Sequence, residues 1–224
     1  VLSDAAGLAT FSALSVNLAG SKQLTATSGV LTPATSSEFT ISAGAAATLA
    51  FNVQPSNGVA GATIAPAVQV QVTDTFGNAV AGSNVALALV GTGTLTGGAA
   101  VLSDAAGLAT FSALSVNLAG SKQLTATSGV LTPATSSAFT ISPAAAAALS
   151  FSVQPSNVVA GVAIAPTVQV KVADAFGNGI AGSSVALALV GTGTLAGGAA
   201  VLSDAAGLAA FSTLSIELAG SKQL

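Results

Sequence analysis

The sequence predicts an all-β protein made of antiparallel β-sandwich domains, about 100 residues each, joined in tandem into a rod. Two observations lead to this prediction. The stretch "VLSDAAGLA" starts at Val1, again at Val101 and again at Val201, so the chain repeats itself every hundred residues. Within each copy, apolar and polar residues alternate along short segments separated by Gly, Pro, Asn and Ser, which is typical of strands joined by turns.

The repeat also predicts the domain boundaries. A period of this length exceeds the roughly 20–45 residues of solenoid units and suits independently folded domains. We place the boundaries in the Ala-rich stretches 41–50 and 141–150, where neighbouring copies differ most. Residues 1–42 are then the C-terminal part of one repeat, 43–142 a complete repeat, and 143–224 a repeat that lacks its last strands. We expect the chain to be a slice of a longer repetitive polypeptide.

The complete repeat is expected to form seven strands. The strictest alternation lies in "AVQVQVTD", where Val68, Val70 and Val72 face one side and Gln69 and Gln71 the other. No segment has a sustained period of 3.6 residues, and the alanines at 144–148 are too few to hold a helix alone, so we expect a connector there. The predicted strands span 48–54, 67–74, 84–90, 99–104, 110–118, 122–128 and 137–142.

Composition excludes several functions. The 224 residues include no His, Cys, Trp or Tyr, and charged residues make up 5%. Without His or Cys, the commonest general base, the thiolate nucleophile and the usual zinc ligands are missing, so we do not expect an enzyme. Four basic residues cannot form the stripe that nucleic acid requires. No unbroken apolar run is long enough to span a membrane in this segment.

Two acidic motifs raise the question of a metal site. "DTFGN" begins at Asp74 and "SDAAG" at Ser103, and both recur one hundred residues later. Asp and Asn commonly bond their own backbone in turns and Gly supplies a positive φ, so we expect both motifs to be strand corners, with Phe76 closing the end of the sandwich. Calcium needs several converging oxygen ligands and is kept as the lesser alternative. Its candidate ligands are Asp74, Asn78, Asp104, Asp174, Asn178 and Asp204.

A repeated lysine and a Gly-rich segment are interpreted as structural features and not as binding sites. Lys22, Lys122 and Lys222 occupy one repeat position and are expected to be solvated. The segment "GTGTLTGG" at 91–98 lacks the lysine of a phosphate-binding loop and does not lead into a helix, so we interpret it as a hairpin turn. We predict no catalytic residue and no cofactor-binding residue other than the calcium alternative.

The unit resembles bacterial immunoglobulin-like tandem repeats of large surface proteins, the Big type found in adhesins of the invasin and intimin kind. The likeness rests on "LAFNVQPSN", "VQVQVTDTFGN", "ATFSALS", "LTATS" and "ATSSAFTI". The matching segments are 49–78, 109–115, 119–120, 124–128 and 134–141. The resemblance implies an immunoglobulin-like fold, an extracellular location at the bacterial cell surface, and repeats that mostly serve as spacers.

These observations predict a structural extracellular repeat, a stalk or fibre segment that extends an adhesive or anchoring end from the cell. Its expected partners are the neighbouring repeats of the same chain. One alternative is a self-assembling subunit of a filament or sheath, because the weakly polar surface favours lateral or end-to-end contacts between chains. A second alternative is a ligand-binding adhesin module for carbohydrate or a host receptor, which requires an exposed aromatic or charged patch.

Overall fold

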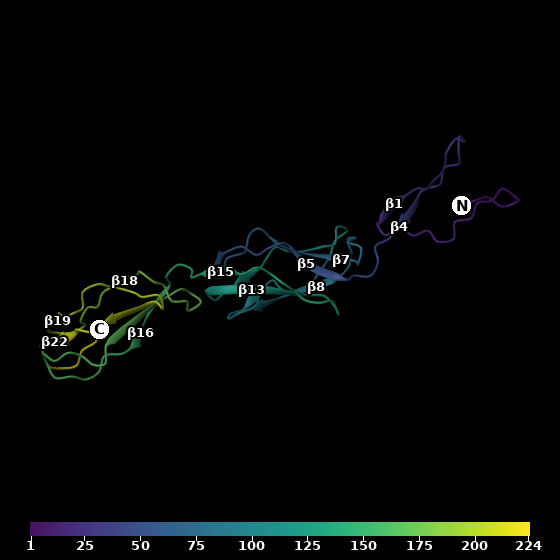
Figure 1. The fold of residues 1–224 in the computed structure, drawn as a ribbon. Coiled ribbons are helices and arrows are strands. Elements are labelled where there is room, and N and C mark those ends of the chain that lie inside the picture. The colour runs from purple at the N-terminus through teal and green to yellow at the C-terminus, as the bar shows by residue number, and fades with distance from the viewer.

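The computed structural model describes residues 1–224 and shows an all-β protein with several antiparallel sheets. The prediction of an all-β chain is therefore confirmed. The structure contains no helix with the length and hydrophobicity needed to cross a membrane. In Figure 1 the N-terminal residues lie at one end of the molecule and the C-terminal residues at the other, with residues 43–142 between them.

The second repeat, residues 43–142, contains two main sheets. Its strands are β5 (Thr48–Val53), β6 (Gly58–Val59), β7 (Val68–Thr73), β8 (Asn84–Val90), β9 (Leu95–Thr96), β10 (Val101–Leu102), β11 (Leu108–Phe111), β12 (Ser115–Val116), β13 (Gly120–Thr127), β14 (Ala134–Thr135) and β15 (Phe139–Ser142). One sheet has the order β10-β8-β13-β15-β6 with β14 beside β13, the other has the order β11-β7-β5, and β9 and β12 form a separate ribbon. All pairs are antiparallel except β15 with β6, which are parallel.

The core of the second repeat lies between its two main sheets. Along β7 every second residue is buried, so Val68, Val70 and Val72 face inward as predicted. They belong to one hydrophobic cluster with Phe111 of β11 and Leu124 of β13, which joins side chains of both sheets. Because burying a large apolar side chain contributes about 1.5–3 kcal/mol, this cluster is the main source of stability of the repeat.

Each of the seven predicted segments contains a strand, but the structure also adds strands that were not predicted. The segment 110–118 divides into the end of β11 and the short strand β12. The strands β6, β9 and β14 lie outside the predicted segments, and like β12 each has two residues. These strands are two residues long, too short to show alternation, and only their tertiary partners define them. The alanine run 144–148 forms no helix, and its last residue begins a strand.

The third repeat, residues 143–224, forms its own cluster. Its strands are β16 (Ala148–Val153), β17 (Val168–Ala173), β18 (Ser184–Val185), β19 (Leu195–Ala196), β20 (Val201–Leu202), β21 (Leu208–Phe211) and β22 (Ser215–Ile216). They pair as a sheet of order β16-β17-β21 and two ribbons, β18-β20 and β19-β22. Val168, Phe211 and Leu214 are the centre of a hydrophobic cluster that is separate from that of the second repeat.

The first repeat, residues 1–42, has little buried surface. Its strands are β1 (Gly20–Lys22), β2 (Thr25–Ala26), β3 (Ala34–Thr35) and β4 (Phe39–Ile41), paired as β1-β4 and β2-β3. Apart from Glu38, which replaces Ala138, its sequence is identical to that of residues 101–142. Phe11 is nevertheless 56% exposed, whereas Phe111 is 2% exposed, because Phe111 packs against strands supplied by residues 43–100.

This contrast gives a matched pair of variants. We expect Phe111→Ala to destabilise the second repeat by about 3–5 kcal/mol, because it leaves a cavity in the core. Phe11→Ala changes the same residue in the same local sequence but removes little buried surface, so we expect a change within about 0.5 kcal/mol. Urea denaturation followed by circular dichroism measures both. Equal losses in the two variants would contradict this account of the core.

Candidate functional site

The motif at Asp74 forms the corner that follows β7. The backbone N–H of Asp74 donates to the carbonyl of Asn78 at 2.9 Å, and the N–H of Gly77 donates to the carbonyl of Asp74 at 3.1 Å. Gly77 has a φ of +83°, a conformation that residues with a Cβ rarely adopt. The predicted strand corner is therefore confirmed.

The carboxylate of Asp74 is buried and accepts four hydrogen bonds. Its Oδ1 accepts the backbone N–H groups of Phe76 and Asn78, both at 2.9 Å. Its Oδ2 accepts the backbone N–H of Gly44 and the side-chain Nδ2 of Asn78, both at 2.8 Å. The carboxylate thus joins the corner to the connector that enters the second repeat.

These donors stabilise the charged form of the carboxylate. The side-chain bond from Asn78 is the largest influence and, with the backbone amides and against the effect of burial, it lowers the pKa of Asp74 to about 2. For Asp174, burial acts to raise the pKa, but the bonds from the Asn178 side chain and the surrounding amides outweigh it and leave the pKa below its ordinary value. Both carboxylates are therefore ionised near neutral pH.

The side chain of Asn78 connects the second repeat to the first. Its Nδ2 donates to the backbone carbonyl of Asn17 at 2.8 Å, and its Oδ1 accepts the backbone N–H of Ala19, also at 2.8 Å. The primary amide thus pairs with one carbonyl and one N–H of a neighbouring chain segment, as a peptide group does at the edge of a sheet. Asn17, Ala19, Gly44, Asp74 and Asn78 are hereafter the first junction.

The same arrangement recurs between the second and third repeats. Asn178 donates to the carbonyl of Asn117 and accepts the N–H of Ala119, both at 2.9 Å, and Asp174 accepts the N–H of Ala144 at 2.9 Å. Asn117, Ala119, Ala144, Asp174 and Asn178 are the second junction. The contacts to Asn117 and Asn17 use only backbone groups, so no side-chain pattern in the sequence indicated them.

The phenylalanine of the corner does not enter the core. Phe76 was expected to close the end of the sandwich, and this prediction is wrong, because its side chain is 65% exposed. The polar side chain of Asn78 in this corner faces the preceding repeat, and the Phe76 ring lies outside the core. Phe176, at the same position in the next repeat, lies over Gly61 of the second repeat: a Cβ built on Gly61 would be 2.3 Å from the Phe176 Cζ. The absence of a side chain at Gly61 therefore allows the two repeats to approach.

The remaining candidate ligands lie in turns of their own. Asp104 Oδ1 accepts the N–H groups of Ala106 and Leu108 at 2.8 and 3.0 Å, and the N–H of Gly107 donates to the Asp104 carbonyl, which confirms the predicted turn. Asp204 repeats this pattern. The structure brings Asp74 together with Asn78, and Asp174 with Asn178, but no group of three or more acidic side chains gathers at one point. Calcium binding stays an untested alternative.

One lysine also differs from expectation. Lys122 was predicted to be solvated, but it is 3% exposed, so the prediction is wrong for this residue. Its Nζ donates to the carbonyl of Ala119 and to Thr92 Oγ1, both at 3.2 Å. Ala119 is also the residue whose N–H meets Asn178. Alternation along β13 places Lys122 on the same face as Leu124, and this signal in the sequence could have revealed its burial.

Comparison of the chain with protein-family models and with curated protein sequences gives no match. The candidate site is therefore defined by geometry alone, as a pair of repeated junctions between successive copies of the unit.

The pKa of Asp74 makes the first junction sensitive to acid. A carboxyl group whose pKa is lowered on folding stabilises the fold above its unfolded pKa, and this contribution is lost as pH falls through the folded value. We therefore expect stability from Asp74 to be complete above about pH 4 and to disappear as pH falls toward 2. Carboxyl carbon NMR titration measures the pKa directly. Asn78→Ala should raise it toward 3.8, and a wild-type value already near 3.8 would contradict the hydrogen-bonding geometry.

The close approach at Gly61 can be tested against a matched glycine. Gly61 and Gly161 have φ values of +75° and +79°, but a Cβ on Gly161 would meet no atom within 4 Å. Both changes to alanine carry the same backbone strain, so we expect only Gly61→Ala to displace the Phe176 ring and loosen the second junction. Amide exchange at Ala119 and Ala144 measures this loosening. Equal exchange rates in the two variants would show that the ring does not secure the junction.

Proposed function

We propose that the chain is a segment of an extracellular stalk or fibre of a large bacterial surface protein. In this proposal each repeat is an immunoglobulin-like β-sandwich, successive repeats form a rod, and the rod extends an adhesive or anchoring end away from the cell. The observation that carries the proposal is the repetition of the junction: the same backbone and side-chain atoms make the same hydrogen bonds at both boundaries.

The chemistry of the junction suits a mechanical role. The side chain of each asparagine makes two hydrogen bonds to the preceding repeat and one to the aspartate of its own repeat, and that aspartate accepts an N–H from the connector. An intramolecular hydrogen bond contributes about 0.5–1.5 kcal/mol, so several bonds at separate points favour one orientation of neighbouring repeats over many. Because the same contact occurs at both junctions, it favours the same rotation and translation from one repeat to the next. Successive repeats then extend the chain in a regular way.

The composition supports a spacer over a catalyst. The chain has no His and no Cys, and the two aspartates with the most altered pKa values already accept hydrogen bonds from the junctions. The two carboxylates whose pKa values are most altered are therefore assigned to holding neighbouring repeats together. Small-angle X-ray scattering and electron microscopy of the chain test the shape directly, and protease accessibility on intact producing cells tests the extracellular location.

A variant at the second junction tests whether the hydrogen bonds of Asn178 keep the chain extended as a rod. We expect Asn178→Ala to remove both hydrogen bonds to the second repeat and to broaden the distribution of end-to-end distances by small-angle scattering, with both cores still folded. Asn52→Ala is the control, because Asn52 bonds only to Gln69 within its own repeat. A compact particle in the wild type, or identical distributions in both variants, would contradict the proposed rod.

A further inference from the structure

The segment that the second repeat presents at the second junction belongs to no strand. It lies between β12, which ends at Val116, and β13, which begins at Gly120. Two of its backbone groups, the carbonyl of Asn117 and the N–H of Ala119, bond the side chain of Asn178. Ordering a short irregular segment costs conformational entropy, so other groups of the second repeat must hold it in place for the junction to form.

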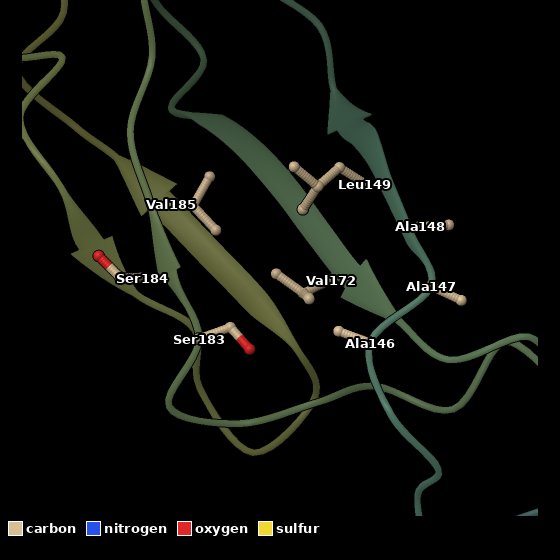
Figure 2. A pocket seen from close by; sticks show the side chains of 8 residues that line it. All are labelled: Ala146, Ala147, Ala148, Leu149, Val172, Ser183, Ser184 and Val185. Atoms are coloured by element: carbon tan, nitrogen blue, oxygen red, sulfur yellow. The ribbon is translucent and has the colours of Figure 1, made fainter.

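The opposite side of the junction is held by the third repeat. Asn178 donates to Asp174 at 2.8 Å, and Asp174 also accepts the N–H of the connector residue Ala144. Farther along the connector, the N–H of Ala147 donates to the carbonyl of Ala173 at 2.9 Å. Figure 2 shows Ala147 and its neighbours in the connector alongside β17. The orientation of the two repeats therefore depends on how the second repeat holds its own segment.

A buried lysine holds the end of this segment. The Nζ of Lys122 donates to the carbonyl of Ala119 at 3.2 Å. Ala119 is thus bonded from two sides, because its N–H meets the third repeat and its carbonyl meets the lysine. A hydrogen bond from an ammonium group is stronger than one between neutral groups, and a buried ammonium that loses an acceptor is costly. Displacement of Ala119 would therefore leave the ammonium without one of its acceptors.

The lysine bond recurs at the first junction. Lys22 Nζ donates to the carbonyl of Ala19 at 3.2 Å, and the N–H of Ala19 donates to Asn78 Oδ1 at 2.8 Å. In both junctions, one alanine accepts a hydrogen bond from a lysine of its own repeat and donates one to an asparagine of the following repeat. The lysine is therefore connected to the contact between repeats as well as to the core.

A glycine-rich hairpin holds the rest of the segment. Residues 91–94 are Gly-Thr-Gly-Thr, and Thr92 Oγ1 is the second acceptor of Lys122 Nζ, at 3.2 Å. The N–H of Thr94 donates to Asn117 Oδ1 at 2.7 Å. The hairpin thus fixes the side chain of Asn117, whose backbone carbonyl is the one presented to the third repeat.

The glycines of this hairpin allow it to lie close to the segment. Gly93 has a φ of +109°, and a Cβ built there would be 3.0 Å from Asn117 Oδ1 and 3.1 Å from Leu118 Cβ. Gly91 has a φ of +123°, and its Cβ would be 3.3 Å from Lys122 Cδ. Another residue at either position would be strained and crowded. The glycines that suggest a phosphate-binding loop are therefore required for close packing.

The contact between lysine and hairpin also recurs. Lys222 Nζ donates to Thr192 Oγ1 at 3.1 Å, and a Cβ built on Gly193 would be 3.1 Å from Leu218 Cβ. The lysine and the hairpin therefore form a unit that belongs to the repeat and not to a single position of the chain.

We propose that Lys122 and the hairpin 91–94 are the positioning elements of the second junction. Lys122 fixes the carbonyl of Ala119, and the hairpin fixes the side chain of Asn117. The backbone groups that bond Asn178 are then ordered before the third repeat docks, which lowers the entropy cost of the contact. This inference rests on the proposed function only in taking the junction as the contact that orients neighbouring repeats.

Amide exchange at Ala119 in the full chain tests the lysine, under conditions in which the second repeat stays folded. Lys122→Met keeps an unbranched side chain and removes the ammonium. We expect the Ala119 N–H to exchange at least about tenfold faster, because a charged hydrogen bond no longer holds the segment. Leu124→Val is the control on the same face of β13. It should lower the urea midpoint of the second repeat and leave the exchange rate of Ala119 unchanged.

A pair of changes at Thr92 tests the hairpin without altering the core, because Thr92 is exposed. Thr92→Val keeps the branched shape and removes only the hydroxyl acceptor, so we expect exchange at Ala119 to be at least about threefold faster. Thr92→Ser retains the acceptor and should exchange at the wild-type rate. If Lys122→Met unfolds the second repeat, this pair decides the question alone.

A combination with Asn178→Ala separates positioning from general stability. Once Asn178→Ala has removed the acceptor of the Ala119 N–H, Lys122→Met should change its exchange rate by less than about twofold, because the two residues act on one contact. An unchanged rate in Lys122→Met, equal rates in Thr92→Val and Thr92→Ser, or the same fold-change with and without Asn178 would each overturn the proposal. A compact wild-type particle in scattering would contradict the stalk but not this inference, since Ala119 exchange is measured at the junction itself.

Discussion

The structure depends on the burial of apolar side chains from both halves of a repeat against each other. Strand β7 and strand β8 come from the first half, and β11, β13 and β15 come from the second. Each half supplies strands to both main sheets, and the core cluster joins side chains of the two halves. The second repeat has both halves and a continuous core, whereas the first exposes Phe11, whose equivalent Phe111 is buried.

The same constraint explains the third repeat. It has strands from both halves and buries Val168, Phe211 and Leu214 in a cluster of its own.

The junctions use polar chemistry that the core does not. A buried carboxylate is costly unless its oxygens accept hydrogen bonds, and Asp74 receives four from three residues. This arrangement fixes the Asn78 side chain with its amide directed at the preceding repeat. A chain with few charged residues thus uses two of them where neighbouring repeats meet, and the hydrogen bonds provide direction where apolar contact alone would be non-specific.

The sequence by itself determined the strands with strong alternation, the turn character of Asp74 and Asp104, and the absence of helix at 144–148, because these follow from local periodicity and local hydrogen bonding. The alternation along β13 also places Lys122 among the buried residues, a signal that the prediction missed. Only the tertiary structure decided that Asn78 bonds the backbone of Asn17. The two-residue strands were likewise decided by their tertiary partners. These features arise from contacts between residues far apart in the chain, often through backbone atoms that every residue type shares, so no pattern of side chains records them.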